Sequence, residues 1–412
     1  MTWTLKQIAD MDSVDPLASK KDLFELPKNI IYLDGNSLGA MPKSVQRRAE
    51  NVLKNEWAQG LIKSWNTHNW IGLPQKVGDK IANLIGAETG EVVAADSTSV
   101  NIFKIVTAAL QIQEGRTKII SEKGNFPTDL YILQGIDALM EGGAKLHALD
   151  RDKIYDAIDK ETAVIHLTHV HYKTGALFDM DAITKKAHDV GALVVWDLAH
   201  TAGAMPIDLN GADADFAVGC GYKYLNGGPG APAFLFVAKR HQENVRPPLS
   251  GWMGHDKPFD FSDDYKPAKG INRNLCGTPS AIALSILEEG LKTFDGVDMD
   301  DIRDKSMALG SLFVELIQDN CAGHGFELAS PKSADKRGSQ VSLTHANGFE
   351  IMQALIDHGV IGDFRAPDIV RFGFTPLYTS FQNVWDAVEV LEKIMEKDLW
   401  KDPKYAVRSK VT

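Results

Sequence analysis

The chain contains 412 residues and has a formal net charge of −11, with 44% hydrophobic and 24% charged residues. This composition is typical of folded soluble proteins and argues against a largely disordered chain or a disulfide scaffold. Because the chain is acidic and its basic residues form no run longer than pairs such as "KK" and "RR", nucleic acid is not an expected partner.

The cysteines and the apolar runs indicate the compartment. Cys220, Cys276 and Cys321 are odd in number and widely spaced, which favours reduced thiols over a disulfide framework or a zinc site. The first residues lack a basic flank followed by an apolar stretch, and no apolar run approaches the ~18 residues that span a bilayer. We therefore expect a cytoplasmic protein that does not bind membranes.

Short apolar runs alternate with helical patterns between about residues 90 and 240, which predicts an α/β fold. The helical spacing of residues 180–191 ends at Gly191 and predicts one helix of a strand–helix–strand unit. Four runs rich in Val, Ile and Phe predict strands buried on both faces of a mostly parallel sheet, at 162–167, 192–196, 215–220 and 233–237.

The second half of the chain has a different pattern. Residues 247–279 are rich in Pro, Gly and charge, which predicts a long functional or interfacial loop. Helices are expected at 280–294 and near 300–320, 348–359 and 381–398. Since the chain is too long for one core, we expect a large α/β domain at 62–278 and a smaller α+β domain built from 1–61 and 279–412.

Reactive side chains follow three of the expected elements. Asp197 ends one strand, with His200 close behind, and Tyr222 and Lys223 follow the next strand. The Ser97–Ser99 turn begins a helix of about four turns, where free N–H groups and the helix dipole attract an anion such as phosphate. Simple N-capping is the alternative for this turn. Ligands in open α/β sheets bind at the carboxyl ends of the strands, so these groups are expected to meet there.

Lys223 lies in a glycine-rich and proline-rich loop, where an exposed surface lysine is the ordinary expectation. Its neighbours change that expectation. Pyridoxal 5′-phosphate needs a lysine that captures its aldehyde, an acid beside its ring nitrogen and a cradle for its phosphate. Lys223, Asp197 and the Ser97–Ser99 turn supply these three groups together, so the sequence predicts a pyridoxal-phosphate site.

Seven motifs extend this prediction to a family. The sequence resembles the bacterial type of kynureninase over nearly the whole chain, at "YLDGNSLG" (32–39), "NFPTDLY" (125–131), "LTHVHYKTG" (167–175), "WDLAHTAGA" (196–204), "GYKYLNGGPG" (221–230), "LSGWMGH" (249–255) and "RFGFTPLY" (371–378). The resemblance implies a fold-type I pyridoxal-phosphate enzyme, with a seven-stranded-type sheet covered by helices on both faces in the large domain. It also implies a homodimer with active sites at the subunit interface.

The reaction that the resemblance implies is hydrolysis of L-kynurenine to anthranilate and L-alanine, by cleavage of the Cβ–Cγ bond, in tryptophan catabolism and NAD biosynthesis. Lys223, Asp197 and Tyr222 would be the catalytic residues, with Tyr222 as candidate for the last proton transfer. The other cofactor-binding residues would be Thr98, Ser99, Phe126, Asp129, Thr168, His200, Trp252 and Thr278, the last two from the neighbouring subunit. Arg371, Ser37 and Trp65 would bind the substrate.

One position that differs from the animal members of the family concerns the choice of substrate. Animal members tend to carry Asn at the position of Thr278 and to favour 3-hydroxykynurenine. Thr278 therefore predicts a preference for unhydroxylated kynurenine, with 3-hydroxykynurenine as a possible second substrate.

Competing interpretations remain at this stage. "GNSLG" (35–39) matches the nucleophile elbow of serine hydrolases, but Pro42 stands where the elbow's helix should run. His166, His169 and His171 have no acidic cluster beside them, so no metal site is expected. A cysteine desulfurase of the same superfamily would need a mobile cysteine, and none of the three lies in an evident active-site loop. A non-catalytic binding protein is disfavoured by the intact lysine, aspartate and arginine set.

Overall fold

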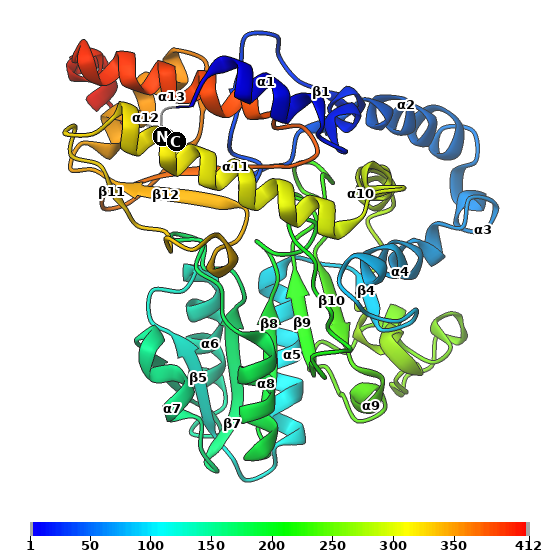
Figure 1. Cartoon of the computed structure of the whole chain (residues 1–412). Helices are drawn as coiled ribbons and strands as arrows, with labels where there is room; N and C mark the ends of the chain where they lie inside the picture. The colour runs from blue at the N-terminus through cyan, green and yellow to red at the C-terminus, as the bar shows by residue number, and fades with distance from the viewer. Residues whose placement is uncertain (1–2, 409–412) are drawn as a thin grey trace.

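The computed structural model describes residues 3–408. Its main sheet has the order β4-β10-β9-β8-β7-β5-β6, and β10 alone runs antiparallel to its neighbours. The carboxyl ends of the other strands therefore meet at one edge (Figure 1). The strands are β4 (Val92–Ala94), β5 (Lys118–Glu122), β6 (Lys145–Leu149), β7 (Thr162–Thr168), β8 (Leu193–Asp197), β9 (Phe216–Gly219) and β10 (Phe234–Val237).

The α/β prediction is confirmed, and all four predicted strands are present. Every residue of β7, β8, β9 and β10 is buried, as expected for continuous apolar runs covered on both faces. The predicted strand at 215–220 was slightly too long, because β9 ends at Gly219 and leaves Cys220 in the loop that leads to Lys223.

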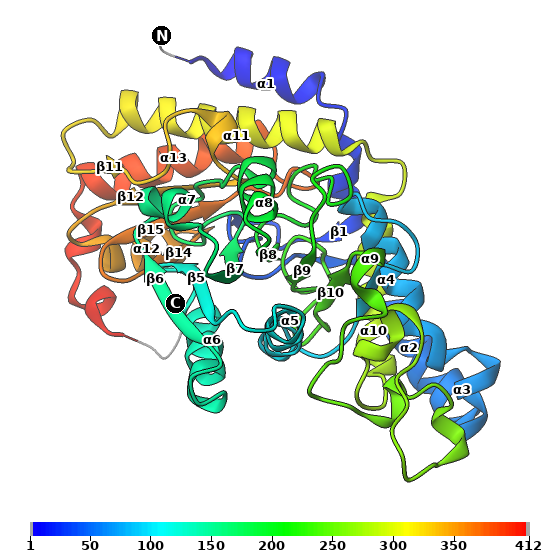
Figure 2. The same ribbon diagram turned by 90° about the horizontal axis from the view of Figure 1, so that it is seen from below.

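Helices cover both faces of this sheet. Figure 2 shows α5 (Thr98–Ile112) and α6 (Pro127–Leu139) on one face, and α7 (Ile154–Ala157) and α8 (Met180–Asp189) on the other. The predicted helix at 180–191 is α8, which begins where the Asp179 carboxylate accepts the Ala182 N–H at 2.9 Å. It ends just before Gly191, whose φ of +75° ends the helical path.

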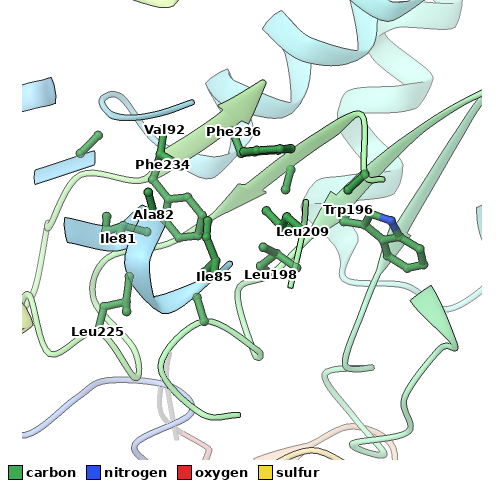
Figure 3. Packing of buried hydrophobic residues seen from close by; sticks show 14 of the residues in the cluster. Ile81, Ala82, Ile85, Val92, Trp196, Leu198, Leu209, Leu225, Phe234 and Phe236 are labelled. Carbon is green, nitrogen blue, oxygen red and sulfur yellow. The ribbon is translucent and has the colours of Figure 1, made fainter. Parts of the chain in front are cut away.

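The pleat of the strands divides the core into two layers. Phe234 and Phe236 of β10 pack on one face with Ile81 of α4 (Leu73–Leu84) and with Ile85, which caps that helix (Figure 3). Leu235, between the two phenylalanines, belongs to the cluster on the opposite face, which includes Ile102, Ile105 and Val106 of α5. Alternate side chains of one strand thus fill both layers, which holds the strand ends in a fixed position.

A second sheet has the antiparallel order β11-β12-β15-β14. Figure 1 shows it below the long helix α11, with α1 from the amino-terminal part lying beside α11 and α13. Its strands are β11 (Glu327–Leu328), β12 (Gln340–Thr344), β14 (Asp363–Arg365) and β15 (Ile369–Gly373). The helices around it are α1 (Leu5–Ser13), α11 (Met299–Asn320), α12 (Gly348–Asp357) and α13 (Phe381–Glu396).

Both ends of the chain contribute to the core on this second sheet. Ile8 and Leu33 pack among residues of the carboxyl-terminal helices, and β2 (Ile31–Tyr32) pairs in parallel with β13 (Val360–Ile361). Phe24 and Val52, however, belong to a core cluster of the main sheet. The domain division at 61/62 and 278/279 stays a prediction.

The remaining segments also follow the expected pattern. Residues 247–279 contain only short 3-10 turns and isolated bridges, as predicted for a long loop. The helix expected at 280–294 is α10 (Ala281–Leu291), followed by a 3-10 turn. The other elements are β1 (Phe24–Glu25), β3 (Met41–Pro42), α2 (Lys43–Asn51), α3 (Ser64–Thr67) and α9 (Lys239–Gln242). Within residues 3–408, no helix combines the length and apolarity that a bilayer crossing requires.

Candidate active site

A cavity of about 150 Å³ opens at the carboxyl edge of the main sheet. Its walls come from the loops after β4, β5, β7, β8 and β9. Nine of the residues that the sequence predicts for a cofactor site line it together: Thr98, Ser99, Phe126, Asp129, Thr168, Asp197, His200, Tyr222 and Lys223. Residues from five segments of the chain therefore share one space.

Strand register explains why these groups meet. Thr168 and Asp197 end β7 and β8, and they are direct partners in the parallel ladder. The Thr168 hydroxyl donates to the Asn125 side-chain oxygen at 2.6 Å, which ties the loop before α6 to the end of β7. Asn125 in turn accepts the backbone N–H of Phe126 at 2.7 Å. The Phe126 ring is thereby held at the cavity, where it is 40% exposed.

Two buried carboxyl groups face one end of the cavity. Asp197 is 3% exposed, and its Oδ1 accepts the Ala199 N–H at 2.7 Å. Burial raises the pKa of Asp197 well above its ordinary value, and the nearby Asp129 raises it further. Asp129 lies 2.8 Å from His166 Nε2. A pair of buried acids with one raised pKa is suited to a protonated ring nitrogen, whose positive charge would favour the ionised form of Asp197.

Lys223 lies between an aromatic wall and a histidine. Its Nζ is 2.9 Å from His200 Nε2 and 5.8 Å from the centroid of the Phe126 ring. His200 is 3% exposed, and burial, together with the positive charges of Lys223 and Arg371, lowers its pKa well below the ordinary value. The imidazole is therefore neutral at pH 7, and Lys223 faces an uncharged partner.

The start of α5 forms another wall. Ser97 is the N-cap, and its hydroxyl accepts the Val100 N–H at 3.4 Å. N-capping, the alternative considered for this turn, is thus present, but Thr98 and Ser99 also line the cavity. The first turn of a long helix leaves N–H groups available for an anion. Burial raises the pKa of Tyr222, so its phenol stays protonated and can donate a hydrogen bond to the same anion.

Arg371 lies beside this cavity rather than in its lining. It is 2% exposed on β15, and its Nε donates to Asp363 Oδ1 at 2.7 Å. Its Nη2 donates to the Ser37 hydroxyl at 3.0 Å, and its Nη1 donates to the Tyr172 carbonyl at 2.5 Å. Because Tyr172 lines the cavity, this carbonyl connects Arg371 to the Lys223 site.

Ser37 belongs to this arginine cluster. Its hydroxyl donates to Asp363 Oδ2 at 2.9 Å, and Arg365 Nη2 lies 3.3 Å from it. Among the described residues, no histidine hydrogen-bonds to Ser37, so the base that a serine nucleophile needs is not beside it. The hydrolase interpretation of "GNSLG" is therefore not supported.

Three predicted residues lie apart from the cavity. Trp252 is 42% exposed and packs with Phe259, at 5.6 Å between ring centroids. Thr278 lines a different cavity, beside Gly230. Trp65 packs edge-on against Trp70, at 5.6 Å between centroids. Within one chain, these three side chains do not join the Lys223 site.

The three histidines of "HLTHVHY" have structural partners. His169 Nδ1 pairs with the Thr201 hydroxyl at 3.1 Å, and His171 Nε2 pairs with the Gly124 carbonyl at 3.2 Å. Burial lowers the pKa of both to about 4. In the part of the chain that the structure describes, no group of three or more His, Cys, Asp or Glu side chains is arranged to hold a metal ion.

Comparison with known proteins decides the family. The family model described as "Kynureninase C-terminal domain" matches residues 302–391, and that of the DegT/DnrJ/EryC1/StrS aminotransferase family matches residues 70–213. The chain is 50% identical over 414 aligned positions to a kynureninase of Burkholderia pseudomallei strain 1106a, covering 99% of this chain and 100% of that one. The chain belongs to the kynureninase family.

Solved structures share the fold of this kynureninase-family chain at low sequence identity. A cysteine desulfurase of Thermococcus onnurineus NA1 is similar with a TM-score of 0.76 and 20% identity, covering 96% of this chain and 99% of that one. A variant of C-DES with glycine covalently linked to its PLP cofactor has a TM-score of 0.73 and 15% identity, covering 89% of this chain and 97% of that one. These similarities concern the fold alone.

Two residues near the site were not predicted from the sequence. Gln340, 1% exposed at the start of β12, places its side-chain oxygen 3.1 Å from His200 Nδ1. Asp363, 1% exposed on β14, binds Arg371 and Ser37. Both belong to the second sheet, and His200 and Ser37, which they contact, lie far from them in the sequence. A polar residue in an apolar run, as in "QVSLT" (340–344), was the available signal for Gln340.

Proposed function

We propose that the chain hydrolyses L-kynurenine to anthranilate and L-alanine by cleaving the Cβ–Cγ bond, with pyridoxal 5′-phosphate as cofactor. The observation that carries the proposal is the shared cavity of Lys223, Asp197 and the start of α5, in a chain of the kynureninase family.

The residues fit this cofactor at each of its polar groups. Pyridoxal phosphate, when bound, supplies an aldehyde that captures amines and a ring that withdraws electrons from the α-carbon of a bound amino acid. Asp197 would hold the ring nitrogen, whose positive charge would counter the burial and the Asp129 charge that raise the pKa of Asp197. Phe126 would stack on the ring. The other residues around the cofactor would be Asp129, Thr168 and His200.

The phosphate would lie at the start of α5. Thr98 and Ser99 would contribute hydroxyl and backbone donors, and the neutral phenol of Tyr222 would add a third hydrogen bond. Lys223 would hold the aldehyde carbon and, once displaced by the substrate's amine, take the proton from the substrate's α-carbon. Tyr222 is the proposed donor of the last proton, at the β-carbon of the alanine product.

Arg371 would bind the α-carboxylate of kynurenine, because a planar guanidinium offers two parallel donors. Asp363 accepts from both Nε and Nη2, the Ser37 hydroxyl also accepts from Nη2, and the Tyr172 carbonyl accepts from Nη1. Ser37 would therefore contact the substrate beside Arg371. Trp65 is a further proposed substrate-binding residue, and Thr278 would favour kynurenine over 3-hydroxykynurenine.

We also propose a homodimer in which Trp252 and Thr278 complete the partner's site. Two features support it: these residues lie away from the Lys223 cavity of their own chain, and a mostly apolar hollow of about 830 Å³ lies open at the surface. Leu38, Met41 and Ile282 line that hollow and are 37%, 44% and 38% exposed. Exposed apolar surface of this kind marks an association site.

Mixed dimers test this assembly directly. Lys223→Ala and Trp252→Ala chains would each be inactive alone, but a dimer of one of each would contain one intact site. Random mixing should restore about a quarter of the wild-type activity. No recovery in a mixture shown by light scattering to exchange subunits would contradict the shared site.

The reaction itself is tested with two readouts. The purified holoenzyme should release fluorescent anthranilate from L-kynurenine, and borohydride should fix the cofactor on a peptide that contains Lys223. Cofactor fixed on Lys223 without anthranilate release would indicate another reaction of the same fold, such as cysteine desulfuration. Failure of both would reject the pyridoxal-phosphate proposal. We place the activity in the cytoplasm, in tryptophan catabolism and in NAD biosynthesis.

A further inference from the structure

A line of hydrogen bonds joins the second sheet to Lys223. Gln340 Nε2 donates to the Tyr172 carbonyl at 2.9 Å and approaches the His171 carbonyl at 3.4 Å. Gln340 Oε1 lies 3.1 Å from His200 Nδ1, and His200 Nε2 lies 2.9 Å from Lys223 Nζ. Gln340 and His200 are 1% and 3% exposed, so water does not compete for these contacts.

The donor and acceptor of each hydrogen bond in this line follow from the contacts of Gln340 with the two backbone carbonyls. The two backbone carbonyls can only accept, so the amide nitrogen of Gln340 must face them. The amide oxygen then faces His200 Nδ1, and an oxygen can only accept there. Nδ1 must therefore carry a proton. In a neutral imidazole the other nitrogen has none, so Nε2 presents a lone pair to Lys223.

We propose that Gln340 is a positioning residue that fixes the Nδ1-protonated tautomer of His200 and thereby makes Nε2 a hydrogen-bond acceptor for Lys223. In the opposite tautomer, Nε2–H would point at the N–H groups of Lys223, and Nδ1 would point its lone pair at the Gln340 oxygen. Two contacts would then be repulsive. The fixed tautomer instead orients the Lys223 amine at the cavity whenever it is not bound to the cofactor.

The surrounding charges keep this acceptor neutral. Lys223 faces Nε2, and Arg371 and Arg365 on β15 and β14 add further positive charge. Together with burial they lower the pKa of His200 well below its ordinary value. His200 thus holds a transferred proton only weakly, which leaves the proton with Lys223 or with the reacting carbon. The tautomer does not depend on the proposed reaction, but its use in turnover rests on the proposed function.

The first test reads the tautomer itself. In protein with 15N-labelled histidine, the His200 signals are assigned by their loss in His200→Gln. We expect a protonated Nδ1 and an unprotonated Nε2 in the wild type, both with the cofactor bound and after the cofactor has been removed. A protonated Nε2 in the cofactor-free wild type would overturn the inference, whatever the enzyme's activity.

The second test changes Gln340. Gln340→Met removes the acceptor of Nδ1–H, and we expect a mixture of tautomers. Gln340→Glu places a carboxylate against Nδ1–H, and the pH midpoint of the His200 15N signals should rise by about one to three units. The holoenzyme's absorbance-against-pH profile should move in both variants.

Gln242→Met is the matched control. Gln242 is 7% exposed, and its amide also donates to two backbone carbonyls, those of Gly90 and Val237, at 2.8 and 3.1 Å. The Gln242→Met variant should lose about as much stability as Gln340→Met but keep the wild-type His200 tautomer and the wild-type absorbance-against-pH profile. Unchanged His200 signals in Gln340→Met, or equal changes in Gln242→Met, would each refute the assignment. Anthranilate release by the wild type reports separately on the proposed function.

Discussion

Replacing Arg371 with lysine tests how the proposed carboxylate site works. The arginine is 2% exposed, and its fork donates to Asp363, to the Ser37 hydroxyl and to the Tyr172 carbonyl. Lysine keeps the positive charge but presents it as a point on a flexible stem. The variant therefore separates the contribution of the fork from that of the charge.

The size of the effect follows from the bonds that change. Losing one charge-assisted hydrogen bond to the substrate costs about 1.5–3 kcal/mol. That corresponds to roughly a tenfold to hundredfold fall in kcat/KM. Because the carboxylate takes no part in bond cleavage, most of the loss should appear in KM. Asp363 keeps Arg365 as a partner, so the loss of stability should stay below the ~3–5 kcal/mol of an orphaned buried charge.

The assay is anthranilate fluorescence over a range of kynurenine concentrations, combined with thermal unfolding. Arg337→Lys is the matched control, since Arg337 is also 2% exposed and donates to the Pro331 and Lys332 carbonyls and to the Ser311 hydroxyl. Both variants should unfold at lower temperature, but only Arg371→Lys should raise KM. An unchanged KM in Arg371→Lys, or an equal rise in the control, would refute the reasoning.

Three further predictions concern other parts of the chain. Lys223→Ala should fold but lose the visible absorbance band of the bound cofactor, and a persisting band would identify a different lysine. Thr278→Asn should shift the ratio of kcat/KM values toward 3-hydroxykynurenine, and an unchanged ratio would remove Thr278 as a selectivity determinant. Asp215 raises the pKa of His188 above its ordinary 6.5, through a 3.0 Å contact. A folded-state pKa above the unfolded-state value stabilises the folded protein at pH values below the unfolded-state pKa, and this stabilisation is lost as pH rises through the folded-state pKa. In urea titrations, His188→Gln should therefore destabilise the protein most below about pH 6.5 and progressively less above it. A deficit that does not change with pH would contradict this linkage.

The sequence was most informative where one short segment determined both position and chemistry. Asp197 and Lys223 follow buried apolar runs, and parallel strands bring their carboxyl ends to one edge regardless of the rest of the fold. The Ser97–Ser99 turn could be recognised for the same reason, since capping is a local property. Local signals therefore sufficed for Asp197, Lys223 and the Ser97–Ser99 turn, whereas Phe126, Asp129 and Thr168 came from the motif resemblance.

Contacts between the two sheets could not be predicted in this way. Gln340 meets His200 only because β12 packs against the edge of the main sheet, whereas Asp363 and Arg371 are register partners on the neighbouring strands β14 and β15. No periodicity encodes that approach. The raised pKa of Asp197 was equally hidden, because it depends on burial and on Asp129 rather than on sequence neighbours. The motif resemblance named Arg371 and Ser37, but not the carboxylate that holds them.

One backbone carbonyl connects these hidden contacts. Tyr172 lines the cavity, and its carbonyl accepts from Arg371 Nη1 and from Gln340 Nε2. The arginine proposed to bind the substrate and the glutamine proposed to orient His200 thus share one acceptor on the loop after β7. A substitution that shifts this loop should disturb both groups together, whereas Gln340→Met should disturb the His200 tautomer and leave the Arg371 contacts to Asp363 and Ser37 intact. The second sheet therefore reaches the Lys223 cavity through the Tyr172 carbonyl and through the Gln340–His200 contact, and its two effects remain separable by substitution.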